Sequence, residues 1–222
     1  MRLPARVVIK QKSAKKLIKK FNSGKIDWSS KELADLKLKI RRILRKEQDE
    51  VCPYCQRIIV MERRNAYEDI EHFLDKSKAH YRRYAFSVVN IVLSCHACNF
   101  EKSIRDVGSQ ALIAGGDLRP ENRVFRWPHP HFNDLRACII KRPGQVYEPI
   151  QGSGLEAESR TMISDLKLDD PSNIEGRYSR LMEKANKINL ICQKAIEIGG
   201  ERNRLRVATL LRKQKRILDS LW

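Results

Sequence analysis

The sequence contains no long run of apolar residues. A membrane-spanning helix needs about 20 consecutive apolar residues, and no segment of the 222 residues approaches that length. The first 20 residues, MRLPARVVIKQKSAKKLIKK, are basic throughout and lack the apolar centre of a secretory signal peptide. From these two absences we expect a cytoplasmic protein with no membrane partner.

Carboxylates are scarce as well. The chain has 27 Asp and Glu against 45 Lys and Arg, which gives a formal net charge of +18, and no acidic residue precedes Asp27. This excess favours a polyanionic partner, because neutralising phosphates releases condensed counterions and drives association. A solvated basic surface is the alternative. The charge alone therefore predicts nucleic acid as a partner.

The N-terminal part, residues 1–50, combines a basic arm with an amphipathic helix. Ser29 and Glu32 have the S-x-x-E spacing of a helix capping box. Apolar residues then recur at helical intervals, with basic residues between them. We expect a helix over about 30–49 whose polar face is positive.

The C-terminal part, residues 176–222, shows two further helical patterns separated by Gly199 and Gly200. It is predicted to be a basic helical region. Residues 107–175 alternate between turn-forming residues and short apolar runs, which indicates a loop-rich extension with short strands that packs on the core. Its motif WPHPHF, residues 127–132, is interpreted as buried packing with a polar edge; assistance at an active site is the alternative.

The middle segment, residues 51–106, mixes strand and helix signals. Residues 86–93 are rich in β-branched residues and suit a buried strand. The stretch after Cys98, NFEKSIRDVG, has the composition of a short helix that ends at Gly108. Together with the terminal helices, this segment predicts an α+β fold.

Four of the six cysteines form two C-x-x-C pairs: Cys52 and Cys55, and Cys95 and Cys98. In a reducing compartment such cysteines favour metal binding or catalysis over disulfides. Two pairs can present four thiolates tetrahedrally, as structural Zn²⁺ sites require, and such a site leaves no coordination position for water. A redox C-x-x-C is the alternative, although it needs only one pair and a thioredoxin-like context. The zinc is therefore expected to be structural.

Several polar residues lie between and just beyond the two pairs. Glu71 and His72 are adjacent, and Asn90 follows; Asn99 and Lys102 are three residues apart and so share a helix face. An isolated Glu-His pair is most often a solvated surface pair. In this order, however, Cys52-x-x-Cys55, Glu71-His72, Asn90 and Cys95-x-x-Cys98-Asn99-x-x-Lys102 resemble the zinc-stapled HNH endonucleases, whose active site is a ββα-metal module.

This resemblance implies a role for each matching residue. His72 would be the general base, and Asn90 would orient it or hold the loop before the second strand. Glu71 and Asn99 would bind the catalytic Mg²⁺ or Mn²⁺, since hard oxygen ligands suit these ions. Lys102 would contact phosphate. The implied activity is hydrolysis of phosphodiester bonds in nucleic acid, with DNA favoured and RNA possible.

The segment EHFLDKSKAHYRR departs from the family pattern, because it lacks the Pro and the Gly pair that many members carry after the His. It also places Lys76, Lys78, Arg82 and Arg83 close to the expected metal. These residues and His96, which lies inside the second cysteine pair, are candidates for nucleic-acid binding. A solvated loop is the alternative interpretation of the same charges.

A narrower resemblance concerns the flanks. The basic start, EQDEVCPYCQRII, IEHFLDKSK and WPHPHF are similar to the HNH nuclease of Septu-type antiphage systems, including those tied to retrons. That likeness implies antiviral defence together with an ABC-type or SMC-like ATPase partner. A zinc-stapled module that binds nucleic acid or docks on an ATPase without catalysis remains the alternative.

Overall fold

The structure is a computed structural model that describes residues 9–59, 61–62, 65–66, 68–119, 125–142 and 146–219. Within these ranges the fold is α+β, with eight α-helices and three two-stranded antiparallel sheets. The helices are α2 (Lys12–Asn22), α3 (Ala34–Glu47), α4 (His96–Lys102), α5 (Gln110–Ile113), α6 (Leu135–Cys138), α7 (Glu156–Asp165), α8 (Pro171–Ile198) and α9 (Glu201–Asp219). The strands are β1 (Met61–Glu62), β2 (Asn65–Ala66), β3 (Glu68–His72), β4 (Ile91–Cys95), β5 (Ile139–Arg142) and β6 (Val146–Pro149).

The helix expected near residues 30–49 is present as a short 3₁₀ turn followed by α3. Its first turn is capped by Ser30, whose side chain accepts a hydrogen bond from the Glu32 amide at 3.3 Å, and not by Ser29. The apolar stripe of α3 is buried through Leu36, Ile40 and Leu44. Gln48 follows the helix, and its carboxamide bonds both the N–H and the C=O of Leu93, each at 2.7 Å. These bonds attach the end of α3 to β4.

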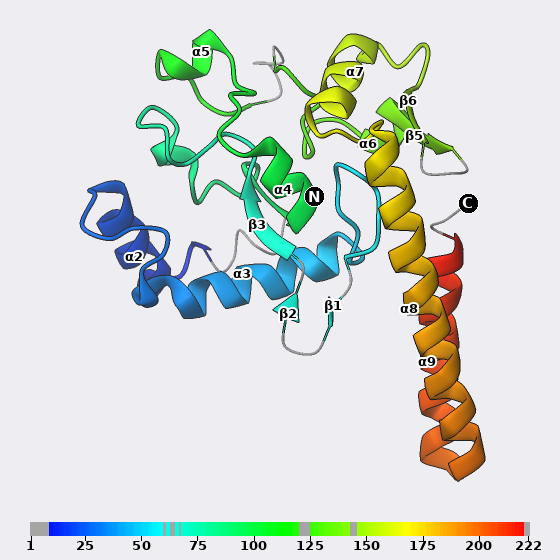
Figure 1. Cartoon of the computed structure of the whole chain (residues 1–222). Helices are drawn as coiled ribbons and strands as arrows, with labels where there is room; N and C mark the ends of the chain where they lie inside the picture. The colour runs from blue at the N-terminus through cyan, green and yellow to red at the C-terminus, as the bar shows by residue number, and fades with distance from the viewer. Residues whose placement is uncertain are drawn as a thin grey trace.

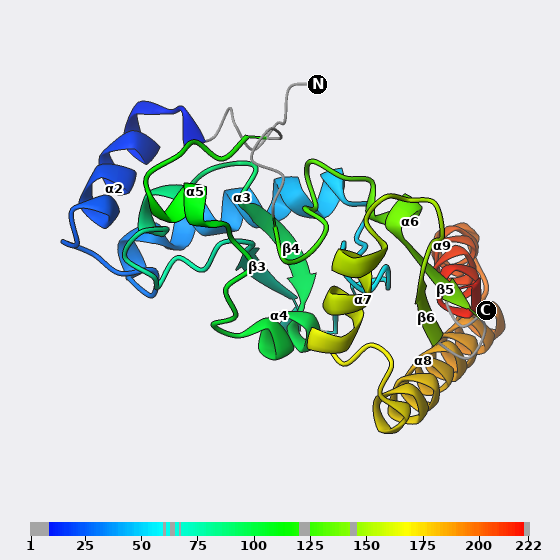
Figure 2. The same cartoon turned by 90° about the horizontal axis from the view of Figure 1, so that it is seen from above.

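At the centre of the molecule, β3 pairs with β4 and α4 follows β4 directly (Figures 1 and 2). The strand predicted over 86–93 is shorter and later than expected, because residues 86–90 form turns and the strand begins at Ile91. The helix predicted after Cys98 begins earlier, at His96, where the Cys95 sulfur caps its N-terminus by accepting from Cys98 N–H. It ends at Lys102 rather than near Gly108, because Ser103 has a left-handed φ of 46°.

The region after α4 forms small elements that pack on this centre. The hairpin of β5 and β6 and the short helices α5 and α6 agree with the expected loop-rich extension, whereas the helix α7 was not predicted. Trp127 and His129 are buried: the indole N–H donates to Asp165 at 2.8 Å, and His129 stacks on Phe132 with ring centroids 3.9 Å apart. They pack the core and lie outside the cavity described below.

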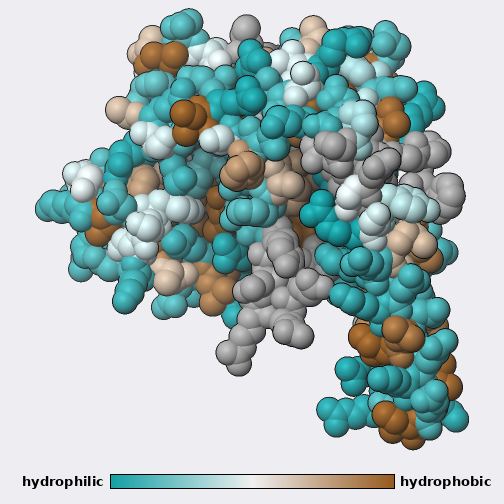
Figure 3. All heavy atoms as spheres, viewed as in Figure 1, coloured by the Kyte–Doolittle hydropathy of each residue, from teal (hydrophilic) through white to brown (hydrophobic). Residues whose placement is uncertain are grey.

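The buried residues form two separate clusters. The larger one runs from Ala14 to Leu168, and the smaller one lies between α8 and α9 and includes Ile188 and Ile217. Gly199 and Gly200, both at positive φ, make the turn between the two helices, as predicted. Figures 1 and 2 show this hairpin projecting from the body, and Figure 3 shows apolar surface on its projecting part. No helix in the described ranges is long and apolar enough to cross a membrane.

Candidate metal centre and active site

The four cysteines of the two C-x-x-C pairs come together in space. The sulfurs of Cys52, Cys55, Cys95 and Cys98 all lie within 4.8 Å of one another. Cys55 Sγ and Cys95 Sγ are 3.7 Å apart, which is close to the roughly 3.8 Å edge of a sulfur tetrahedron with Zn–S bonds of about 2.3 Å. The cluster can therefore hold a metal ion such as zinc.

The surroundings of the cluster shift its thiols in opposite directions: hydrogen bonds with Cys52, Cys95 and Cys98 lower the pKa of the Cys55 thiol well below its usual value. Burial raises the pKa of the Cys52 thiol well above its usual value, and the hydrogen bond with Cys55 adds to this. Arg57 supplies a nearby cation; burial opposes its charge, but the Cys55 sulfur and its neighbours raise the pKa of the guanidinium. Because a metal must displace thiol protons that burial favours, the occupancy of this site is expected to depend on pH.

A cavity of about 590 Å³ is lined by residues of α3, β3, α4 and the loops next to them. Four of the five residues expected at an HNH centre line it: Glu71, His72, Asn99 and Lys102. Asn90 is not among its lining residues. The remaining walls are formed by Trp28, Ala34, Asp35, Lys37, Leu38, Arg41, Asp69, Ile70, Asp75, Lys76 and Ser103.

His72 is held as a neutral imidazole with one nitrogen left as an acceptor. Its Nε2 lies 3.1 Å from the Ala85 carbonyl oxygen, and because a carbonyl only accepts, Nε2 carries the proton and Nδ1 the lone pair. Burial lowers the pKa of His72 well below its usual value, and the charges of Lys76 and Lys102 lower it further. The Trp28 ring meets the imidazole edge to face, with centroids 4.5 Å apart.

Asn90 holds the loop that leads from β3 to β4. It is fully buried, accepts a hydrogen bond from Leu74 N–H at 2.7 Å, and donates to the carbonyls of Leu74 and Tyr84, each at 3.1 Å. Of the two roles expected for it, this is the loop-holding one. The partner of the histidine ring is instead the carbonyl of Ala85, within the loop that Asn90 holds.

Glu71 and Lys102 form a buried pair in the wall of the cavity. Tyr54 donates its hydroxyl proton to Glu71 Oε2 at 2.5 Å, and Lys102 Nζ donates to the His72 carbonyl at 2.8 Å. Lys102 Nζ also lies 2.8 Å from Glu71 Oε1 and forms an ion pair with it, although this buried oxygen accepts no hydrogen bond from a described residue. Lys102 is 2% exposed, lines the cavity and bonds its neighbours, and its expected contact with phosphate stays a prediction.

Asn99 is positioned by a carboxylate that the sequence reading left unassigned. Its Nδ2 donates to Asp69 Oδ2 at 3.1 Å, and His96 Nδ1 lies 2.8 Å from the same oxygen. This leaves Asn99 Oδ1 without a donor among the described residues. Asp69 could have been found from strand alternation, because Asp69 and Glu71 are two residues apart on β3 and so point to the same side.

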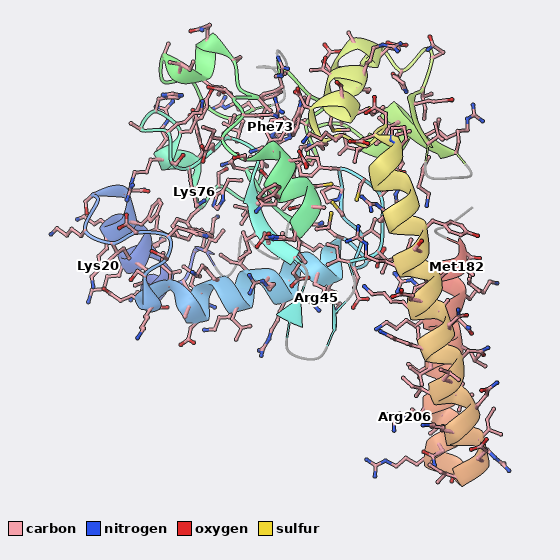
Figure 4. The ribbon with its side chains drawn as sticks, in the orientation of Figure 1. Lys20, Arg45, Phe73, Lys76, Met182 and Arg206 are labelled. Atoms are coloured by element: carbon pink, nitrogen blue, oxygen red, sulfur yellow. The ribbon has the colours of Figure 1, made fainter. Side chains whose placement is uncertain are left out.

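The other basic candidates differ in their positions. Lys76 lines the cavity from the loop that follows β3. Figure 4 labels this residue. Lys78 pairs with a carboxylate outside the cavity, and Arg82 and Arg83 donate to backbone carbonyls of other segments. His96 is bonded to Asp69, as described above, and is exposed. None of these four lines the cavity.

The helix wall of the cavity was not recognised from the sequence. Lys37 and Arg41 on α3, together with Trp28 before it, face Glu71 and His72 across the same space. The sequence showed a positive polar face on this helix but gave no sign of which segment the face would meet.

No family model, no curated protein and no solved structure matches this chain.

Proposed function

We propose that the protein is a metal-dependent endonuclease of the HNH type, which hydrolyses phosphodiester bonds in nucleic acid, with DNA as the preferred substrate. One observation carries the proposal. A single cavity contains an imidazole with a free acceptor nitrogen on His72, a buried carboxylate oxygen on Glu71 that is ion-paired with Lys102 but makes no hydrogen bond, and a carboxamide oxygen on Asn99 that accepts no hydrogen bond from a described residue. Folding alone gives no reason to gather a buried imidazole, a buried carboxylate and an amide oxygen around one space.

Glu71 and Asn99 would hold the catalytic cation, Mg²⁺ or Mn²⁺. Both contribute hard oxygen donors, the kind that these ions prefer. Asp69 keeps the Asn99 amide nitrogen engaged, so the amide oxygen is the atom left for a ligand. When bound, the cation supplies stabilisation of the negative charge on the phosphorus centre and on the leaving 3′ oxygen.

The chain's own residues would manage the proton. His72 Nδ1 would accept a proton from the water whose oxygen attacks phosphorus, while the bond from phosphorus to the 3′ oxygen breaks. The Ala85 carbonyl fixes the tautomer that this step needs. Lys102 supports the base by bonding the His72 carbonyl and lying against Glu71, and Asn90 holds the loop that carries Ala85.

The four-cysteine site would bind structural zinc and position α4. Cys95 and Cys98 stand at the start of α4, directly before Asn99, and the other two cysteines come from the segment that follows α3. A zinc ion would therefore fix the helix that delivers Asn99 to the cavity. This arrangement supports a structural role for one metal and a catalytic role for another.

The resemblance to Septu-type nucleases leads us to propose an antiphage role with an ATPase partner of the ABC or SMC type. The α8–α9 hairpin supports a protein partner, because it projects from the body and exposes Ile196, Ile198 and Leu205. The alternative function, a module that binds nucleic acid or docks on the ATPase without catalysis, draws on the same hairpin and on the charge of +18. This alternative does not explain why His72, Glu71 and Asn99 line one cavity.

The test compares wild type with His72→Ala on plasmid DNA and on RNA, with Mg²⁺ or Mn²⁺ and with a chelator, in the presence and absence of a candidate ATPase. The proposal expects metal-dependent cleavage that the substitution abolishes, while zinc content and the folded state persist. His80→Ala is the matched control, because His80 lies in the loop that follows His72 and outside the cavity. Equal cleavage by wild type and His72→Ala would overturn the assignment of His72.

A further inference from the structure

Cationic side chains converge on Trp28 at the α3 side of the cavity. Lys37 comes from α3 and Lys76 from the loop after β3, and their Nζ atoms lie 5.6 and 5.5 Å from the centroid of the Trp28 ring. Lys37 is anchored there because Nζ donates to the Trp28 carbonyl at 2.8 Å. Arg41 lies one turn beyond Lys37 and so shares its helix face.

Few carboxylates pair directly with this group of cations, although Asp35 and Asp75 line the same cavity. Neither Lys37 nor Lys76 forms an ion pair in the described part of the chain. Arg41 Nε lies 3.5 Å from Glu68, but Arg45 pairs with the same Glu68 oxygen, so one carboxylate serves two guanidinium groups.

The surroundings of Lys37 and Lys76 also disfavour the protonated form of both side chains. Burial lowers the pKa of Lys37, and the charge of Arg41 lowers it further. Burial likewise lowers the pKa of Lys76; Asp75 and Glu71 oppose this, while Lys102 and Lys37 add to it. Asp75 is the acid next to Lys76 in the chain, and its carboxylate is occupied by the N–H and hydroxyl of Ser77. A bound anion would relieve this repulsion.

We propose that Lys37, Arg41 and Lys76 form a phosphate subsite, which holds the nucleic-acid backbone at a phosphodiester next to the one that is cleaved. The subsite lies beside the proposed catalytic base, because the Trp28 ring that the lysines flank contacts His72. Helix α3 is therefore part of the substrate-binding surface, although it lies outside the segment that resembles an HNH nuclease. The inference rests on the proposed function and adds a contact to the same cavity.

The test measures binding of a fluorescein-labelled oligonucleotide by anisotropy, in buffer without added divalent metal so that binding is separated from cleavage. The variant is Lys37→Gln with Lys76→Gln, because glutamine keeps a donor for the Trp28 carbonyl and removes both charges. The control is Lys39→Gln with Lys46→Gln, which removes two exposed charges from α3 outside the cavity. Zinc content and circular dichroism confirm that each variant is folded.

The expected result is a Kd about tenfold higher for the Lys37 and Lys76 variant, and a salt dependence reduced by about two phosphate contacts for duplex DNA. The control pair changes Kd less than twofold. Equal weakening by both pairs, or no oligonucleotide binding by wild type, overturns the subsite.

A second experiment follows the fluorescence of Trp28 while inorganic phosphate or the oligonucleotide is added. The Trp28→Phe variant shows which part of the signal comes from Trp28. A weaker response to inorganic phosphate than to the oligonucleotide at equal phosphate concentration is expected. An equal response would instead identify a site for free anions and overturn the assignment to the backbone. Absence of cleavage in the plasmid and RNA assay would refute the nuclease without changing these binding results, so the two failures are distinguishable.

Discussion

Replacing Asn90 with alanine removes the side chain that ties the ends of the β3–β4 loop together. The substitution deletes three hydrogen bonds, one accepted from Leu74 N–H and two donated to the carbonyls of Leu74 and Tyr84. Asn90 is fully buried, so water cannot replace these bonds. At about 1 kcal/mol for each bond, the free energy of unfolding should fall by about 3 kcal/mol, and by more if the backbone groups stay unpaired.

The assay is equilibrium urea denaturation of zinc-loaded protein. With a slope of about 2 kcal/mol per molar urea, a loss of 3 kcal/mol lowers the midpoint by about 1.5 M. Asn189→Ala is the control, since Asn189 is exposed on α8 and its replacement should change stability by less than about 0.5 kcal/mol. A loss below 1 kcal/mol for Asn90→Ala would refute the idea that this side chain holds the loop.

Three further outcomes are expected. Removal of zinc by a chelator, or the substitution Cys95→Ser, should lower the free energy of unfolding by an amount on the order of 10 kcal/mol and unfold the centre of the protein. Metal analysis and thermal denaturation measure this, and an unchanged melting temperature of the metal-free protein would contradict the metal site. Acidification should destabilise the fold, because His72 and His131 have lowered native pKa values and that of His129 is about 2, mainly through burial. The unfolded chain binds protons below pH 6.5 and the native state does not, so stability present above that pH is lost as pH falls, by up to about 1.4 kcal/mol per pH unit for each histidine; urea midpoints that are equal at pH 7.5 and 5.5 would disprove this. Glu71→Gln should abolish metal-dependent cleavage with zinc content intact, and cleavage at the wild-type rate would show that Glu71 is not a ligand.

The sequence predicted which helices and strands form better than it predicted the residues at which they begin and end. Helical periodicity identified α3, α8 and α9, because an apolar stripe at a period of 3.6 residues reports which face is buried. The start of β4 was missed because it is set by Asn90, which bonds backbone groups sixteen and six residues away. The early end of α4 depends on the left-handed backbone of Ser103, which composition does not reveal.

The candidate site was predictable where spacing carried the information. The two C-x-x-C pairs predicted the cluster that the cysteines form. Contacts between distant segments were not predictable, such as the bond from Tyr54 to Glu71 or the approach of Trp28 to His72. They depend on how α3 and the segment that carries Cys52 and Cys55 pack against β3. A sequence pattern predicts which face of an element is buried, but it does not predict which segment that face meets.

The most direct test of the central claim is the rate at which zinc-loaded His72→Ala cleaves nucleic acid in Mg²⁺ buffer, relative to zinc-loaded wild type. If His72 is the general base of a metal-dependent nuclease, the rate should fall by a factor of about 100 or more. A ratio near one between two folded, zinc-containing proteins would contradict the account.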